Sequence, residues 1–350
     1  MIDWVSFVAP CRHAKRVNGG LVASIRPDGS VEWQTYKRVS VRGSHDASVT
    51  VRTHDGSCEH IEVSGNPVKW FQGHNLWGTD DLPALVLSMI EALVQRDDLG
   101  LTPTDEDRAI WRGGGVRLTR VDVTESFHLP SRGDVLAWLR AAEQTAHLSH
   151  RGRGQLVKGS TLYFGKHSRR WSLKLYAKGQ ELDAKGHRQL VVDQLPAVRE
   201  WAERSLRAEL TLRSMELKRR ELDSLGAWQR FDVDSSEVPA QLLRPVLGSM
   251  TMTTTTTLPA SVLESLRPTL RAAFAAWEAG HDLRSMFPRP TFYKFRKELL
   301  AHGIDIATVQ QQEGSNVVPM IRFLEAVPAG IPEWAIGTPL YFEPRRLRVA

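Results

Sequence analysis

The chain has 350 residues, of which 41% are hydrophobic and 8% aromatic, an ordinary composition for a folded protein that makes overall disorder a poor explanation. Its net charge is +6, and it has neither a basic and apolar leader nor an uninterrupted apolar run long enough to span a membrane. The two cysteines, Cys11 and Cys58, lack C-x-x-C spacing and support neither a disulfide framework nor a zinc knuckle, so we expect a soluble, cytoplasmic protein with no membrane partner.

The N-terminal part of the chain mixes predicted strands with predicted helices. Short runs in which polar and apolar side chains alternate predict strands at residues 1–9, 49–53, 61–63, 116–124, 161–165, 171–178 and 206–213. Helical periodicity predicts helices at residues 79–96, 131–147 and 195–204. Strands of a parallel α/β sheet would be apolar throughout, so the alternation favours a sheet with one wetted face. We predict an α+β fold with a largely antiparallel sheet and helices packed on one face.

The composition changes after about residue 229, where we predict the boundary between a domain of residues 1–228 and a smaller, mainly helical domain of residues 229–350. The threonine-rich residues 251–257 fit a linker or an edge strand, because threonine favours strands. Beyond them, residues 258–280 and 290–302 have helical periodicity. The second helix carries Arg289, Lys294, Arg296 and Lys297 at or within its ends, which fits a DNA-binding or assembly element or an ordinary helix with a solvated basic face.

Positive charge is concentrated in residues 147–188. Ten lysines and arginines there stand against Glu181 and Asp183, so this window has a charge of +8 and the rest of the chain −2. A local cationic surface on an otherwise balanced protein favours a polyanion such as DNA, because each neutralised phosphate releases counterions. On charge alone, a solvated basic face explains the window equally well.

Within this window, residues 161–181 predict a hairpin of strand, basic turn and strand. In the second strand the period of two places Ser172, Lys174, Tyr176 and Lys178 on one face. A phenol has a pKa of about 10, so Tyr176 would attack a phosphate only where positive charge or a metal stabilises its phenolate. Lys174 and Lys178 are placed to supply that charge. The alternative is an ordinary, half-buried strand tyrosine with lysines guarding a sheet edge.

Two other predicted strands each carry one acid on the polar face. Asp122 points away from Val121 and Val123, and Glu209 points away from Ala208 and Leu210. Carboxylates on neighbouring strands could hold a hard divalent cation, although salt bridges to Arg120 and Arg207 explain either acid alone. His74, in a glycine-punctuated stretch before a helix, is a further candidate ligand or phosphate contact. A hydrogen-bonded structural or capping histidine is the common alternative.

Several ordered blocks of the sequence resemble the gene II replication initiator family of filamentous phages. The likeness runs nearly end to end and rests on residues 1–3, residues 69–79 with Gln72-Gly73-His74-Asn75 at their centre, and residues 120–124, 168–181, 206–209 and 316–319 before Arg322-Phe323. The family's nucleophile lies in a Tyr-x-Lys-x-x-Glu setting, which falls on Tyr176, Lys178 and Glu181 here.

The resemblance implies a rolling-circle replication initiator in the host bacterial cytoplasm. Such an enzyme nicks the plus strand of a double-stranded phage origin, keeps the 5' phosphate on a tyrosine and later rejoins the displaced strand into a circle. Mg2+ is the implied cofactor, with Mn2+ as a substitute, and the implied partners are the origin duplex, the displaced single strand, a host helicase and polymerase, and further initiator molecules.

These inferences give each candidate residue an expected role. Tyr176 is the expected nucleophile, and Lys178 is expected to stabilise the phenolate or the oxyanions of the transition state. Asp122, Glu209 and His74 are the expected metal ligands, and Glu181 is either a further ligand or a partner of Lys178. The expected DNA contacts are Lys166, Arg169, Arg170, Lys174 and Arg120.

The sequence lacks two motifs that are common in other DNA-processing proteins. It has no His-hydrophobic-His triplet of the kind that many rolling-circle initiators use to bind metal, so the ligand set stays open. Gly113-Gly114-Gly115 lacks the lysine and spacing of a nucleotide-binding loop, so no ATP site is expected. Two rival functions remain: a sequence-specific DNA-binding regulator that does not cut, and a hydrolytic metal nuclease that forms no adduct.

Overall fold

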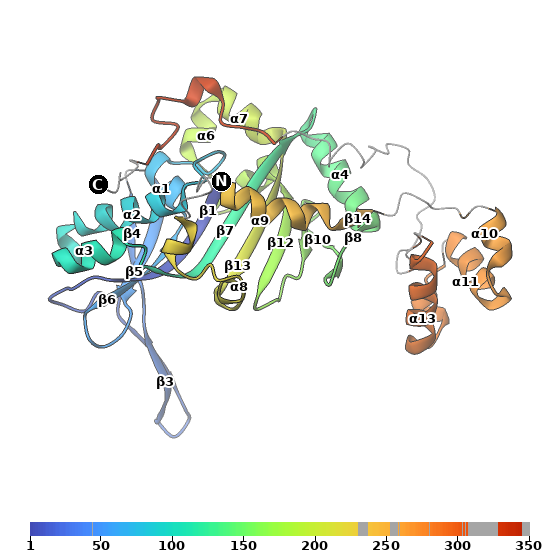
Figure 1. The fold of residues 1–350 in the computed structure, drawn as a ribbon, viewed down its shortest axis with the longest axis horizontal. Helices are drawn as coiled ribbons and strands as arrows, with labels where there is room; N and C mark the ends of the chain where they lie inside the picture. Colours follow the sequence, from blue (N-terminus) through green and yellow to red (C-terminus); the bar gives the residue numbers. More distant parts are fainter. Residues whose placement is uncertain are drawn as a thin grey trace.

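The computed structural model describes residues 1–43, 45–229, 237–252, 258, 260–279, 281–302, 304, 306 and 328–344. Its centre is a nine-stranded antiparallel sheet with the strand order β10-β11-β12-β13-β7-β1-β6-β5-β4 (Figure 1). In chain order these strands are β1 (Ile2–Pro10), β4 (Val39–Arg42), β5 (Ser48–Thr53), β6 (His60–Gly65), β7 (Arg117–His128), β10 (Gln155–Val157), β11 (Thr161–Phe164), β12 (Trp171–Ala177) and β13 (Ser205–Arg213). The predicted antiparallel α+β fold is confirmed, and each of the seven predicted strands is present.

The apolar face of this sheet forms the main core. Alternate residues of the central strands, such as Val121, Leu210 and Leu173, are fully or almost fully buried there. The same core takes buried side chains from several helices, including α2 (Leu82–Val94), α4 (Arg132–Thr145) and α9 (Glu237–Gly248). The first two are predicted helices, and the side chains of Asp81 and Ser131 cap their first turns.

A second group of elements lies beyond the polar face of the sheet, which the sequence did not predict. It comprises α5 (Lys178–Asp183), α6 (Leu190–Gln194), the predicted α7 (Pro196–Glu203), and the segment of residues 328–344 with the short helix η3 (Glu333–Ala335). Leu76, Trp77, Leu182, Val198 and Trp201 form a small apolar core among these elements. Figure 1 shows α6 and α7 beside the red C-terminal segment.

The remaining described elements complete the body around the sheet. They are the hairpin β2 (Leu21–Ile25) and β3 (Val31–Tyr36), the short sheet of β8 (Ala146–Leu148), β9 (Gly152–Arg153) and β14 (Met250–Met252), and α1 (Pro67–Gln72), η1 (Asp97–Leu99), α3 (Asp105–Arg112), α8 (Ser214–Arg219) and η2 (Leu225–Trp228). β14 pairs with β8, so the first residues of the threonine-rich stretch form an edge strand. None of the described helices combines the length and the apolar character needed to cross a bilayer.

The C-terminal helices have a core of their own. They are α10 (Ala260–Ser265), α11 (Pro268–Glu278), α12 (Leu283–Met286) and α13 (Arg289–Leu300), and their core includes Leu270, Phe274, Trp277, Phe292 and Leu299. The single helix expected at residues 258–280 is two helices, because Pro268 begins a new one. The expected helix at residues 290–302 corresponds to α13.

The packing divides the chain differently from the predicted domain boundary at residue 229. Helix α9 and Met250 belong to the main core, and residues 328–344 pack back against the sheet body. The helices α10 to α13 form the separate unit. The family-resemblance block at residues 316–323 and residues 253–257 of the threonine-rich stretch lie outside the described residues.

Candidate functional site

Strand pairing brings the candidate residues together on the polar face of the sheet. Residues opposite one another in a ladder point to the same face, so the register defines rows that run across several strands. Three adjacent rows contain the candidate site: Thr161, Tyr176, Arg207 and Ser126; Tyr163, Lys174, Glu209 and Thr124; and Ser172, Thr211, Asp122 and Trp4.

Tyr176 lies in β12 and is only 2% exposed. The ammonium group of Lys174 lies 4.0 Å from the centre of its ring and that of Lys178 lies 5.9 Å away. The predicted flanking of the tyrosine by two lysines is therefore present. Lys178, however, is the first residue of α5 and not the last of the strand, and both cations lie against the ring.

Arg207, directly opposite Tyr176 in β13, is a buried cation that the sequence did not reveal as part of the site. Burial raises the pKa of the Tyr176 phenol well above its usual range, Glu209 raises it further, and Arg207 opposes both. The guanidinium is fixed because its Nε donates to Ser126 Oγ at 3.2 Å and its Nη2 donates to the carbonyl of Leu76. Arg207 is therefore the group best placed to stabilise a phenolate at Tyr176.

Lys178 is wholly buried and holds two neighbours. Its ammonium donates to Asn75 Oδ1 at 2.8 Å and to Glu181 Oε2 at 2.8 Å. Burial is the largest influence on Glu181 and favours its neutral form, but the charge and hydrogen bond of Lys178, together with His187 and Lys174, outweigh it and lower the pKa of this carboxyl to about 2. Of the two roles expected for Glu181, the structure shows the ion pair with Lys178, and His187 binds its other oxygen at 2.7 Å. Lys178 thus positions the loop of Asn75 against the site.

Asp3 joins the polar face through an irregularity in β1. The register of β1 against β7 shifts between Ile2 and Trp4, so Asp3 is an extra residue and Trp4 faces Asp122. The Asp3 Oδ1 atom accepts hydrogen bonds from the side-chain amides of Asn66 at 3.0 Å and Asn75 at 2.8 Å. It also lies 3.7 Å from Arg207 Nη1. A third carboxylate therefore lies beside the two predicted ones.

Asp122 and Glu209 lie on adjacent strands and face the same side, as predicted. Asp122 binds Arg120 through both oxygens, at 2.9 and 2.5 Å, and Glu209 binds Lys174 at 3.2 Å. The ion pair between Asp122 and Arg120 was the alternative expected from the sequence, whereas Glu209 pairs with Lys174 and not with Arg207. Burial raises the pKa of Asp122 to about 6, and repulsion by Glu209 and Asp3 contributes despite Arg120.

This accumulation of negative charge fits a bound cation. Repulsion between carboxylates is the electrostatic condition that a divalent ion relieves. Within the described part of the chain, no three or more His, Cys, Asp or Glu side chains are grouped closely enough to form a ready-made metal site. A cation would therefore have to displace Arg120 or Lys174 from the carboxylates that they now bind.

His74 does not join these carboxylates. Its Nε2 lies 2.9 Å from the carbonyl of Leu340, and its Nδ1 lies 3.3 Å from the backbone N–H of Leu76. Burial lowers the pKa of His74 to about 4, so the ring is neutral at physiological pH and both nitrogens have partners. The expected metal role of His74 does not fit this arrangement, and the structural role does.

The predicted DNA contacts divide into two groups. Lys166, Arg169 and Arg170 are exposed in the turn between β11 and β12, where Gly165 has a left-handed backbone with a φ of 68°. They are free to meet a phosphate backbone. Lys174 and Arg120 are instead bound to Glu209 and Asp122, so they contribute to the site before any contact with DNA.

Two family models and one sequence relative match most of the chain. The family described as the N-terminal part of the gene II replication-associated protein matches residues 1–230, and the family described as its C-terminal part matches residues 265–343. The replication-associated protein of Enterobacteria phage I2-2 is 39% identical over 339 residues, which are 95% of this chain and 95% of that protein. Among solved structures, a rolling circle replication initiator protein from Geobacillus stearothermophilus aligns over 70% of this chain and 83% of its own, with 15% identity and a TM-score of 0.29.

Proposed function

Because this chain belongs to the gene II replication-associated protein family, we propose that it is a rolling-circle replication initiator that cuts one strand at a phage origin and later rejoins it. It acts as a metal-dependent DNA nicking-joining endonuclease through a covalent 5'-phosphotyrosine. The observation that supports this chemistry is the phenol of Tyr176 lying opposite the buried guanidinium of Arg207, between two lysines.

The proposed first step is a transesterification. Tyr176 Oη loses its proton and attacks the scissile phosphorus, the bond from phosphorus to the 3' oxygen breaks, and that oxygen takes up a proton as the new 3' hydroxyl. Arg207 stabilises the phenolate, which burial alone would disfavour. Lys174, over the ring, adds positive charge close to the phosphate oxygens.

The second step reverses the first on another strand end. A 3' hydroxyl attacks the phosphotyrosine, the new phosphodiester forms, and Tyr176 leaves as the phenolate. The ester keeps much of the energy of the broken bond, so rejoining requires no ATP, in accord with a sequence that lacks a nucleotide-binding loop. Arg207 again stabilises the departing phenolate.

We propose that Asp122 and Glu209 hold Mg2+, or Mn2+ in its place. The bound ion would neutralise the phosphate and polarise its oxygens. Asp3 adds negative charge next to this pair, and Arg120 and Lys174 form ion pairs with Asp122 and Glu209.

The proposed partners follow from the same activity. The origin duplex and the displaced single strand would contact the turn of Lys166, Arg169 and Arg170, with the basic helix α13 as a second DNA or self-association element. A host helicase and polymerase would use the freed 3' end. In the described conformation Tyr176 is covered, so the residues that cover it must shift before a strand reaches the phenol.

One gel distinguishes the proposal from its two rivals. The protein is incubated with supercoiled origin DNA and Mg2+, denatured and separated, and the label of the DNA is followed. The proposal predicts nicked circles and DNA that migrates with protein. A non-cutting regulator would give no nick, and a hydrolytic nuclease would give nicks without a protein-linked band.

A further inference from the structure

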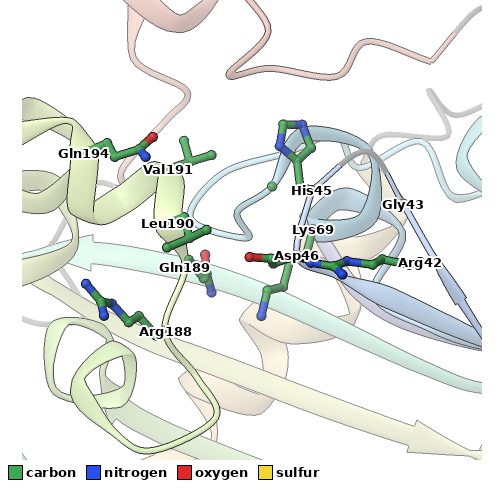
Figure 2. Close-up of a pocket in the computed structure, with 11 residues that line it drawn as sticks. Arg42, Gly43, His45, Asp46, Lys69, Arg188, Gln189, Leu190, Val191 and Gln194 are labelled. Carbon is green, nitrogen blue, oxygen red and sulfur yellow. Dashed lines mark hydrogen bonds and ion pairs between the residues drawn. The ribbon is translucent and has the colours of Figure 1, made fainter.

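A cavity of about 390 Å³ lies beside the proposed active site. One wall comes from Arg42, Gly43, His45 and Asp46, with Lys69 and Gly73 of the α1 segment, and the other from Arg188, Gln189, Leu190, Val191 and Gln194 (Figure 2). Figure 2 shows Lys69 next to Asp46 on the first wall and Gln189 next to Leu190 on the second. Its volume falls within the range of about 300 to 1,000 Å³ that is typical of small-molecule sites, so one nucleotide would fit.

The cavity is lined mainly by positive charge. Arg42, Lys69 and Arg188 contribute cations, against one lining carboxylate, Asp46. Arg42 binds Asp46, and Arg188 binds Asp193 at 2.5 Å. Lys69 has no ion-pair partner within the described residues, so its ammonium is available to an anion from outside. A phosphate is an anion that this lining would favour, because Lys69 has no competing carboxylate among the described residues and the guanidinium groups of Arg42 and Arg188 have donors beyond those that bind Asp46 and Asp193.

The cavity is connected to the active site by hydrogen bonds. Gln189, in its wall, is 4% exposed, and its amide donates to Asn75 Oδ1 at 2.8 Å and accepts from the backbone N–H of Asn75 at 3.3 Å. The same Oδ1 atom accepts from Lys178, and Asn75 donates to Asp3. The side chains of Gln189 and Asn75 therefore connect the cavity to the ammonium group of Lys178, which lies beside Tyr176.

The two walls meet at Gly73, which ends α1 with a φ of 84°. A Cβ atom there would lie 2.8 Å from the ring of His45 and 2.9 Å from Val191, so glycine sets how closely the walls approach. Leu190 and Val191 give this end of the cavity an apolar surface. A sugar or base could pack there while its phosphate meets Lys69.

We propose that this cavity binds one phosphate-bearing nucleotide of the DNA strand, next to the phosphate that Tyr176 attacks. The proposal rests on the proposed function for its choice of strand. Binding there would hold the strand in register with Tyr176 through Gln189, Asn75 and Lys178. Lys69 is the principal phosphate contact, and Arg188 is the second.

The first test needs no cleavage. The probe is a labelled single-stranded oligothymidylate of about fifteen nucleotides, which is long enough to reach from the cavity to the active site. It is titrated separately with wild type, Lys69→Gln, Arg188→Gln and Lys218→Gln, and fluorescence anisotropy measures binding. Losing one charged phosphate contact should weaken binding about tenfold for Lys69→Gln and measurably for Arg188→Gln. Lys218, exposed on α8, is the charge-matched control and should leave binding unchanged.

The second test locates the contact. A single neutral methylphosphonate is placed in turn at each position around the nick of an oligonucleotide that wild type cuts, and protein-linked DNA is measured. One position should weaken adduct formation in wild type and have no further effect in Lys69→Gln. If wild type forms the adduct but no methylphosphonate position loses its effect in Lys69→Gln, the proposed nucleotide site in the cavity is wrong and the proposed function is unaffected. If wild type forms no adduct, the proposed function is wrong. If Lys69→Gln and wild type bind the oligothymidylate equally in the first test, the proposed nucleotide site in the cavity is wrong.

Discussion

The phenol of Tyr176 and the guanidinium of Arg207 lie opposite one another on adjacent strands, and both side chains are buried. An arginine without a carboxylate in direct hydrogen-bond contact is costly to bury, because its charge loses water. Here Asp3 lies 3.7 Å away, and the other hydrogen-bond partners are neutral: Ser126 Oγ, the carbonyl of Leu76 and the sulfur of Met1. Arg207 therefore favours negative charge on the neighbouring phenol, which is the charge that attack on a phosphate requires, whereas burial and the charge of Glu209 disfavour it.

We predict that Arg207→Lys slows adduct formation about a hundredfold at neutral pH, the scale on which a lost oxyanion donor acts. Arg207 lowers the pKa of the phenol against the effect of burial, and the shorter lysine would hold its charge farther from the phenol without the fixed guanidinium, so the phenolate becomes harder to form. The rise of the rate with pH should then move to higher pH. Single-turnover rates across a pH series measure this.

Arg213→Lys is the matched control for that series. Arg213 lies on the same strand and face, but it is opposite Arg120 and bonds Ser172. Its substitution should leave the pH profile in place. An unchanged profile in Arg207→Lys, with the fold intact by thermal unfolding, would remove Arg207 from the chemistry.

Asp122 should make the metal-free protein less stable as pH rises. Its pKa is raised to about 6, first by burial, so the folded state holds the proton more tightly than the unfolded chain and loses stability between about pH 4 and 6. Asp122→Asn should remove this loss. Denaturant unfolding in EDTA should show the variant gaining about 3 kcal/mol relative to wild type over this interval.

His74 should make the protein less stable as pH falls, which is the opposite of the pH dependence expected from Asp122. Burial lowers the pKa of His74 to about 4, so the fold resists protonation of the ring and loses stability as pH falls from about 6.5. His74→Gln should therefore gain relative to wild type toward low pH, whereas Asp122→Asn gains toward neutral pH. Parallel curves for either variant and wild type would contradict the burial of that group.

We predict that Asp122→Ala and Glu209→Ala abolish nicking but retain origin binding. These carboxylates are the proposed holders of Mg2+, and the exposed turn that should contact the duplex is left intact. Mg2+ should also raise the melting temperature of wild type more than that of either variant. Nicking that survives both substitutions, or an equal Mg2+ effect in all three proteins, would exclude these two residues as ligands.

The basic turn between β11 and β12 should account for part of the salt dependence of DNA binding. Replacing Lys166, Arg169 and Arg170 with glutamine removes three exposed charges. The slope of log affinity against log salt should fall by about 2 to 3. A triple change of the exposed Lys15, Lys37 and Lys218 is the charge-matched control, and equal slopes for both triples would exclude a specific role of the turn.

Local sequence patterns were sufficient for most of the central sheet. Alternation in residues 171–178 predicted both β12 and the face on which Tyr176 lies, because side chains in a strand alternate whatever the partner strand is. The same reasoning placed Asp122 and Glu209 on one face. Two further elements, which are not among the predicted ones, also have local sequence signals. Asp28-Gly29 is typical of a hairpin turn and lies between β2 and β3, and Thr104 with Asp107 forms a capping box at the start of α3.

The rest of the site depends on contacts between distant segments. Arg207 alternates with apolar residues as a solvent-facing arginine would, but in the structure it is buried and bonds the carbonyl of Leu76, which comes from a segment distant in the sequence. Asp3 reaches the site through a register shift that no short-range pattern specifies. Lys178 resembled a strand residue, because the start of α5 immediately after Ala177 has no capping side chain.

Mass spectrometry of the denatured protein–DNA complex tests the central claim most directly. After nicking and nuclease digestion, the tryptic peptides are searched for a residual nucleotide, with Tyr176→Phe and Tyr163→Phe processed in parallel. We predict a nucleotide on Tyr176 in wild type and in Tyr163→Phe, and none in Tyr176→Phe. A nucleotide on Tyr163, or an adduct that persists in Tyr176→Phe, would contradict the assignment.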